Sequence, residues 1–135
     1  MPSPRLLSRR PLAVAALTAL PLLLAAPAGA QQLIESYSAR LSSVDHFNSN
    51  GERLTSPAAI IRQDRANFHK YGIRDPEDEN DRFFADMANR ALMERLIERG
   101  RTSRSARNAI VNGTPVIHVD LYDGPRGPYV EVNVD

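Results

Sequence analysis

The sequence contains no cysteine, and this absence excludes several kinds of structure and chemistry. No disulfide can join two parts of the fold, no thiolate can act as a nucleophile, and no cysteine-ligated metal site can form. A lipid cannot be attached through an N-terminal cysteine either. The stability of the fold must therefore come from packing alone.

A strong excess of either charge is also lacking. The 135 residues include 17 basic and 16 acidic side chains, and three of the basic ones, Arg5, Arg9 and Arg10, lie within the first thirty residues. Those thirty residues contain no acid, so the remaining 105 carry 14 basic and 16 acidic side chains and a net charge of −2. Nucleic-acid-binding proteins usually carry a clear basic excess, and we therefore expect no nucleic-acid partner.

The long apolar run, "PLAVAALTALPLLLAAP", is short for a membrane span. A bilayer helix needs about 20 apolar residues, and Pro21 interrupts this run. The run follows three arginines and precedes the small residues Ala28–Ala30, which is the layout of a secretory signal peptide. We expect cleavage after Ala30, export to the periplasm or the medium, and no membrane span in residues 31–135. The arginine pair in "SRRPLA" leaves ordinary secretion and twin-arginine export both open.

Periodicity in residues 31–135 predicts a single α+β domain. "ESYSARLSS" alternates apolar and polar residues as a half-buried strand does. "PVIHVDLY" and "YVEVNV" alternate in the same way on either side of "DGPRGP", which is dense in turn residues and predicts a hairpin. The N-terminal strand joins this C-terminal hairpin in a small three-stranded antiparallel sheet, because a hairpin alone is marginal in water. About three helices pack against the sheet, and we expect a monomer.

The helices are predicted from their caps and from apolar spacing. The first begins at Pro57, behind the N-cap Ser56, and ends at Gly72. The second covers "DRFFADMANRALMERLIERG", where apolar residues recur three and four positions apart and place Leu92 between this helix and the sheet. A shorter third helix follows in "TSRSARNAIVNG".

Polar residues crowd the first predicted helix. Arg62, Arg65 and His69 share one side of it at spacings of three and four, whereas Asp64 and Asn67 lie on another side. Guanidinium groups bind anions well, so Arg62, Arg65 and Asn67 are candidates for contact with a small anionic ligand.

A structural interpretation of the same helix competes with ligand binding. Arg65 can offer its planar guanidinium to a carboxylate such as Asp75 or Asp78, while Asp64 accepts hydrogen bonds from loop amides. A buried network of this kind orders a fold without doing chemistry. We favour this interpretation for Asp64 and Arg65.

Another group of polar residues follows the first strand. Asp45 and His46 lie in a predicted loop, and they meet His69 if the first helix folds back over the strand. One carboxylate and two imidazoles can bind a first-row metal or act as an acid–base pair. Asp45 as a turn former and His46 as a surface residue are the competing interpretation, and we expect no metal and no other cofactor.

Known catalytic and metal-binding motifs are missing. The sequence has no pair of histidines at the zinc-helix spacing, no G-x-S-x-G elbow and no Gly-rich phosphate loop. The acidic loop from Asp75 to Asp81 resembles a calcium loop in its alternate spacing. However, Asn80 and Asp86 stand where an EF-hand needs glycine and glutamate. We interpret these acids as favouring the dipole of the helix that follows.

The run "DHFNSNGERLTSPAAIIRQDRANFHKYGIRDPEDENDRFF", from Asp45 to Phe84, resembles a small group of exported bacterial proteins of unassigned function. This resemblance implies an extracytoplasmic α+β domain and implies no activity or site residue. Together with the signal peptide, it favours a cell-envelope binding or interaction module without catalytic activity. Its partner would be an envelope protein or a small anionic ligand.

The alternative is a small hydrolase or metal-dependent enzyme that uses the polar cluster Asp45, His46, Asp64, Arg65 and His69. The two hypotheses predict different geometry. An enzyme needs these side chains to converge on one cleft within hydrogen-bond reach. A binding module shows an exposed apolar or charged patch instead.

Overall fold

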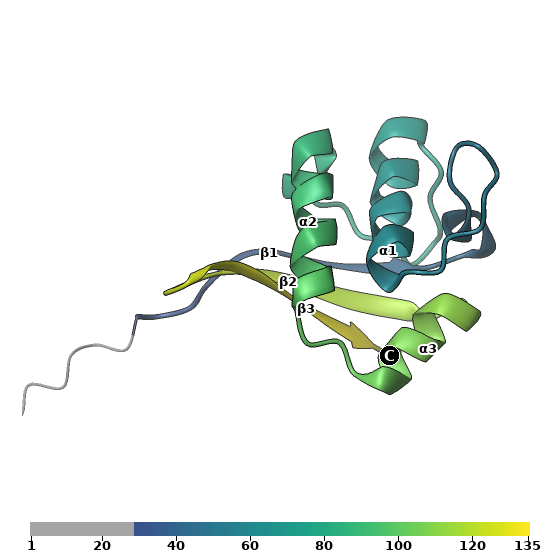
Figure 1. Ribbon diagram of the computed structural model, residues 1–135. Coiled ribbons are helices and arrows are strands. Elements are labelled where there is room, and N and C mark those ends of the chain that lie inside the picture. Colours follow the sequence, from purple (N-terminus) through teal and green to yellow (C-terminus); the bar gives the residue numbers. More distant parts are fainter. Residues whose placement is uncertain (1–28) are drawn as a thin grey trace, which may run out of the picture.

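A computed structural model describes residues 29–135 (Figure 1). The predicted signal peptide covers residues 1–30, so all but its last two residues lie outside the described part. Three short helical segments accompany the longer elements, namely η1 (Ser43–His46), η2 (Asn67–Tyr71) and η3 (Phe83–Ala85). The longer elements follow the order β1 (Gln32–Arg40), α1 (Pro57–Ala66), α2 (Met87–Arg99), α3 (Arg104–Asn112), β2 (Val116–Gly124) and β3 (Gly127–Val134). Within residues 29–135, no helix is both long and apolar enough to cross a membrane.

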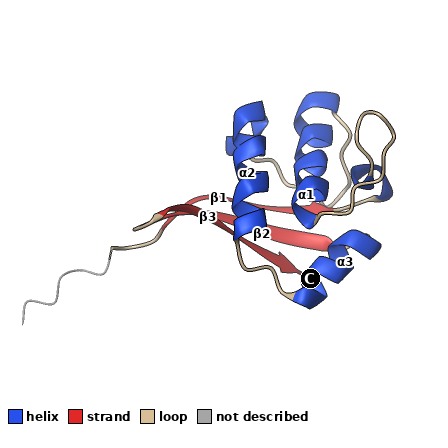
Figure 2. Cartoon of the chain, in the orientation of Figure 1, coloured by secondary structure: helices blue, strands red, loops and turns tan. Residues whose placement is uncertain are grey.

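The three strands form one antiparallel sheet in the order β1-β2-β3, which confirms the predicted small α+β fold (Figure 2). β2 and β3 are the two arms of the predicted hairpin, and Gly127 in its turn has a φ of 100°, a conformation that favours glycine. β1 pairs with β2 along the other side. The middle strand is therefore β2, which pairs with a neighbouring strand along each of its edges.

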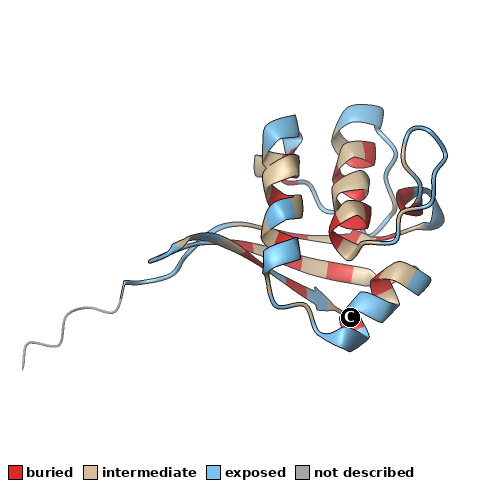
Figure 3. Ribbon diagram, in the orientation of Figure 1, coloured by how far each residue is buried: buried red, intermediate tan, exposed pale blue. Residues whose placement is uncertain are grey.

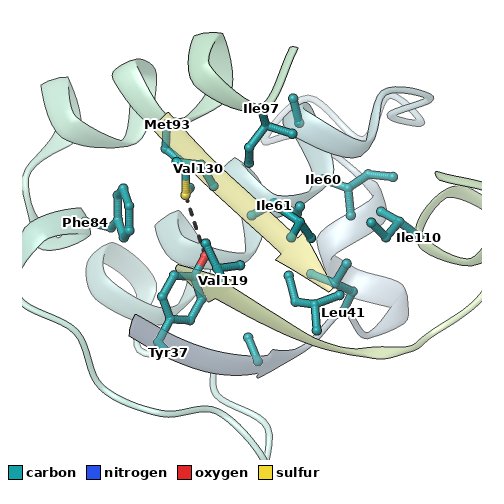
Figure 4. Packing of buried hydrophobic residues seen from close by; sticks show 14 of the residues in the cluster. Tyr37, Leu41, Ile60, Ile61, Phe84, Met93, Ile97, Ile110, Val119 and Val130 are labelled. Atoms are coloured by element: carbon teal, nitrogen blue, oxygen red, sulfur yellow. Dashed lines mark hydrogen bonds between the residues drawn. The ribbon is translucent and has the colours of Figure 1, made fainter. Parts of the chain in front are cut away.

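The core lies between the sheet and the helices. Figure 1 shows α1 and α2 on the same side of the sheet, with α3 close to the end of β3. In Figure 3, buried positions gather where α1 and the strands face one another. Figure 4 shows the central side chains of this core, which are Tyr37, Leu41, Ile60, Ile61, Phe84, Met93, Ile97, Ile110, Val119 and Val130.

The long helix differs from its prediction in its start and in its buried face. The segment η3 ends at Ala85, and Asp86 becomes the N-cap of α2 by accepting hydrogen bonds from the amides of Ala88 and Asn89. Because the helix restarts there, its apolar stripe is rotated. Met93 and Ile97 are buried, whereas Leu92 is half-buried and Met87 is 70% exposed. The predicted position of Leu92 between helix and sheet is wrong.

This rotation can be measured with two substitutions. Met93→Ala should lower the free energy of unfolding by about 2–5 kcal/mol, because Met93 is fully buried and its Sδ accepts a hydrogen bond from Tyr37 (Figure 4). Leu92→Ala, the matched control on the same helix, should cost clearly less, because its side chain already contacts solvent. Urea unfolding gives both values. Equal losses would contradict the observed orientation of α2.

The first helix ends at Gly72 in a left-handed cap, as predicted, but its last turn is not regular α-helix. The side chain of Ser56 caps α1 as predicted, but regular α-helix stops at Ala66. The chain continues as the wider π-helical turn η2, which Gly72 closes at a φ of 67°. The wider turn buries both Asn67 and Phe68 and leaves Tyr71 at the surface.

Candidate functional site

Arg65 lies at the centre of a buried polar network, with none of its surface exposed. Its Nε donates to Asp64 Oδ2 at 2.8 Å, and its Nη1 donates to Asp81 Oδ1 and to the carbonyl oxygen of Glu79, each at 3.0 Å. His69 Nε2 lies 2.8 Å from the same oxygen of Asp81. One cation is thus held by two carboxylates, and an imidazole shares one of them.

Two aromatic rings complete the surroundings of Arg65. Its guanidinium carbon lies 4.2 Å from the ring centre of Tyr37 and 4.5 Å from that of Phe68. Arg74 lies 4.1 Å from the centre of the Phe68 ring as well. Arg65 Nη2 is the one buried side-chain polar atom in residues 29–135 that has no hydrogen-bond partner. The guanidinium is therefore held by its ion pairs and by stacking against aromatic faces.

The predicted partners of Arg65, Asp75 and Asp78, are wrong. The loop that carries them runs along the outer edge of β1, where Asp78 accepts hydrogen bonds from the amides of Arg40 and Asp75. Asp81 lies where this loop enters the interior, and it takes the role predicted for Asp75 or Asp78. Sequence reasoning missed Asp81 as the partner of Arg65. The available signal was its position three residues before Phe84, which is the spacing of a capping contact, and Asp81 does accept a hydrogen bond from the Phe84 amide.

Asp45 and His46 are both buried and bonded within the chain. Asp45 accepts hydrogen bonds from the Ser42 amide and hydroxyl and from Asn67 Nδ2. Burial raises the pKa of Asp45, although these hydrogen bonds oppose the rise. The ring of His46 lies 2.9 Å from the carbonyl oxygen of Ser42 and 2.8 Å from that of Ile110. Asp45 orders a turn, and His46 ties η1 to α3 rather than lying at the surface.

The candidate catalytic side chains do not meet in one cleft. Asp45 contacts Asn67, whereas His69 contacts Asp81 in the network around Arg65. Across residues 29–135, no three histidine, aspartate or glutamate side chains are placed to hold a metal ion. The structure thus contains two internal polar clusters where the enzyme hypothesis needs a single open one.

Among the predicted ligand-binding residues, Arg65 and Asn67 are buried and Arg62 reaches solvent. The side chain of Arg62 is 42% exposed, and it forms an ion pair with Glu94 of α2. It lines a hollow of about 310 Å³ between α1 and α2, together with Lys70 and Tyr71. Contact with an anionic ligand thus remains open to Arg62 but not to its two buried neighbours.

An exposed apolar surface adjoins this hollow. Four large side chains that are 40–48% exposed surround a second hollow of about 440 Å³. The two hollows share Asn48, Ser49, Gln63 and Tyr71, so they form one continuous surface. Gathered apolar groups of this kind mark sites of interaction. We call the four side chains the apolar patch, and they are Val44, Phe47, Tyr71 and Ile73.

Comparison of the chain with protein-family models, with curated proteins and with solved structures gives no match. The resemblance of residues 45–84 to exported bacterial proteins therefore stays a prediction.

Proposed function

We propose that the protein is an exported binding module of the cell envelope and that it contacts a partner protein through the apolar patch. The observation that carries this proposal is the gathering of four large, half-exposed apolar side chains around one hollow. Removing such side chains from water on binding is favourable, roughly in proportion to the apolar area that is buried.

The surroundings of the apolar patch have the usual anatomy of a protein interface. Its apolar centre is bordered by polar side chains, among them Asn48, Ser49 and Gln63. Cations flank its two aromatic rings, with Arg53 at 5.6 Å from the centre of Phe47 and Lys70 at 5.0 Å from the centre of Tyr71. Aromatic anchors beside positive charge favour a partner whose own apolar centre is bordered by carboxylates.

The alternative, a small hydrolase or metal-dependent enzyme, draws less support from this geometry. A catalytic group must reach a substrate, but Asp45, His46 and Asp64 are buried and bonded to other parts of the chain. These contacts instead support a role for the polar clusters in holding η1, α1 and the loop after η2 together.

Photochemical crosslinking in the native envelope tests the proposal. A photoreactive amino acid at Val44 or Ile73 should give a defined product with one envelope protein, whereas the same group at the exposed control position Arg95 should not. Adding Tyr71→Ser should abolish the product and change the free energy of unfolding by less than about 1 kcal/mol, because Tyr71 is exposed. The crosslinked protein should be recovered with Gln31 as its first residue.

Two results would contradict the proposal. Equal crosslinking at Val44 and Arg95, or a product that survives Tyr71→Ser, would show that the apolar patch is not the contact surface. Recovery of the chain from the membrane with Met1 retained would contradict export with cleavage after Ala30.

A further inference from the structure

The two outer edges of the sheet differ in whether other parts of the chain form hydrogen bonds with them. Along β1, the Glu79 amide donates to the carbonyl oxygen of Ser38 at 2.8 Å, and the Ser38 amide donates to the Glu79 carboxylate at 2.7 Å. The Arg40 amide donates to Asp78 at 2.9 Å. The acidic loop thus occupies the edge of β1 and prevents another strand from pairing there.

Along β3, the hydrogen-bond alternation shows which backbone groups face outward. The Asp135 amide donates to the carbonyl oxygen of Val116 at 3.1 Å, so odd-numbered residues of β3 pair with β2. In an antiparallel sheet the intervening residues point their N–H and C=O groups away from that partner. Val130, Val132 and Val134 therefore face the free edge.

Part of this free edge is covered and part is open. A Cβ atom on Gly100 would lie 3.4 Å from the carbonyl oxygen of Val130, so the end of α2 shields that residue. No backbone hydrogen bond within residues 29–135 reaches the outward groups of Val132 or Val134. These two residues offer two N–H donors and two C=O acceptors to a further strand.

A groove accompanies the open edge. A hollow of about 450 Å³ lies beside β3 and α3, and the small side chains of Ala106 and Ala109 line it together with Val132 and Val134. It adjoins a hollow of about 550 Å³ farther along β3, and the two share Arg101, Val132 and Asn133. The groove therefore follows β3 from Gly127 to Val134.

The charge of this groove identifies the chemistry of its occupant. Arg99, Arg101 and Arg126 line it, whereas Glu131 is the one acid among its lining residues in the described chain. Backbone donors and acceptors at a strand edge require an extended segment, and the arginines require that this segment carry carboxylates.

We propose that an acidic, extended segment of a partner protein binds to the outer edge of β3 as a fourth strand, in the groove that runs beside α3. Its backbone pairs with Val132 and Val134, its small apolar side chains face Ala106 and Ala109, and its carboxylates meet Arg99 and Arg101. This surface is separate from the apolar patch, so the two can be tested and can fail independently.

A synthetic peptide of alternating valine and glutamate, acetylated and amidated at its ends, tests the proposal. Titration into the purified full chain should slow hydrogen exchange at the Val132 and Val134 amides. Two control peptides keep the length and change one property each. N-methylation of alternate backbone amides should abolish binding by removing hydrogen bonds, and lysine in place of glutamate should abolish it by reversing the charge.

Charge reversal on the protein provides the second readout. Arg101→Glu should weaken binding of the peptide about tenfold, the effect of losing one good ionic contact. Arg82→Glu, an equal change at an exposed position outside the groove, should alter it less than about twofold. Both positions are exposed, so neither substitution should unfold the protein.

Three outcomes would overturn the proposal. The first is binding of the N-methylated peptide as tight as that of the parent, and the second is slowed exchange at residues outside β3. The third is self-association of the protein alone with the Val132 and Val134 amides already protected, which would make a second copy of the chain the occupant. None of these outcomes would affect crosslinking at the apolar patch.

Discussion

Replacing Arg65 with alanine should lower the free energy of unfolding by about 3–5 kcal/mol, as expected when one member of a buried ion pair is removed. The substitution leaves the fully buried carboxylate of Asp81 without its cation. It also removes the guanidinium that packs against Tyr37 and Phe68. Urea unfolding followed by circular dichroism measures this loss directly.

Two further variants separate the possible causes. Arg65→Lys should restore only part of the stability, because lysine keeps the charge but lacks the planar fork that contacts Asp64 and Asp81 together. Arg62→Ala removes an arginine from the same helix whose ion pair is partly exposed, and it should cost about 0–1 kcal/mol. Equal stability of Arg65→Ala and wild type would show that the network does not hold the fold together.

The protein should lose stability as the pH rises from about 4 to about 7, because burial raises the pKa of Asp64 to about 7 although Arg65 lowers it. In the unfolded chain the pKa of an aspartate is about 3.9. Between these two values the folded protein binds more protons than the unfolded chain does. Raising the pH therefore favours unfolding, by at most about 4 kcal/mol from this group.

Comparison with Asp64→Asn isolates this contribution from all other titrating groups. Asparagine keeps an acceptor for Arg65 Nε but cannot ionise. Near pH 4 the two proteins should have similar stabilities, and the variant should become the more stable of the two as the pH approaches 8. Stability curves that run parallel across this range would show that folding does not raise the pKa of Asp64.

The strands and the start of α1 were predictable because their signals are local. "PVIHVDLY" and "YVEVNV" alternate strictly, and Ser56 followed by Pro57 starts a helix wherever the chain goes next. The buried face of α2 was not predictable, since it depends on a helical turn that stops at Ala85 and a cap at Asp86. A shift of this kind rotates every later side chain while leaving the apolar spacing almost unchanged.

The candidate surfaces depended even more on tertiary structure. The partner of Arg65 is set by the path of the acidic loop, which keeps Asp78 at the edge of β1 and delivers Asp81 to the interior. Tyr71 and Phe47 are exposed, and the sequence alone does not distinguish an exposed aromatic residue from a buried one. Whether the edge of β3 is free depends on where the ends of the neighbouring helices lie.

The pairing of β1 with β2 has a consequence for how the chain reaches this fold. Arg40 pairs with Val116 and Gln32 pairs with Asp123, and all three helices lie between the two strands in the sequence. Closing so long a loop costs entropy before any contact between the strands offsets that cost. The helices can therefore form before the sheet does. Domains dominated by distant pairings fold in milliseconds to seconds rather than microseconds. During synthesis, β1 emerges first and has no strand to pair with until β2, almost the last element, has been made.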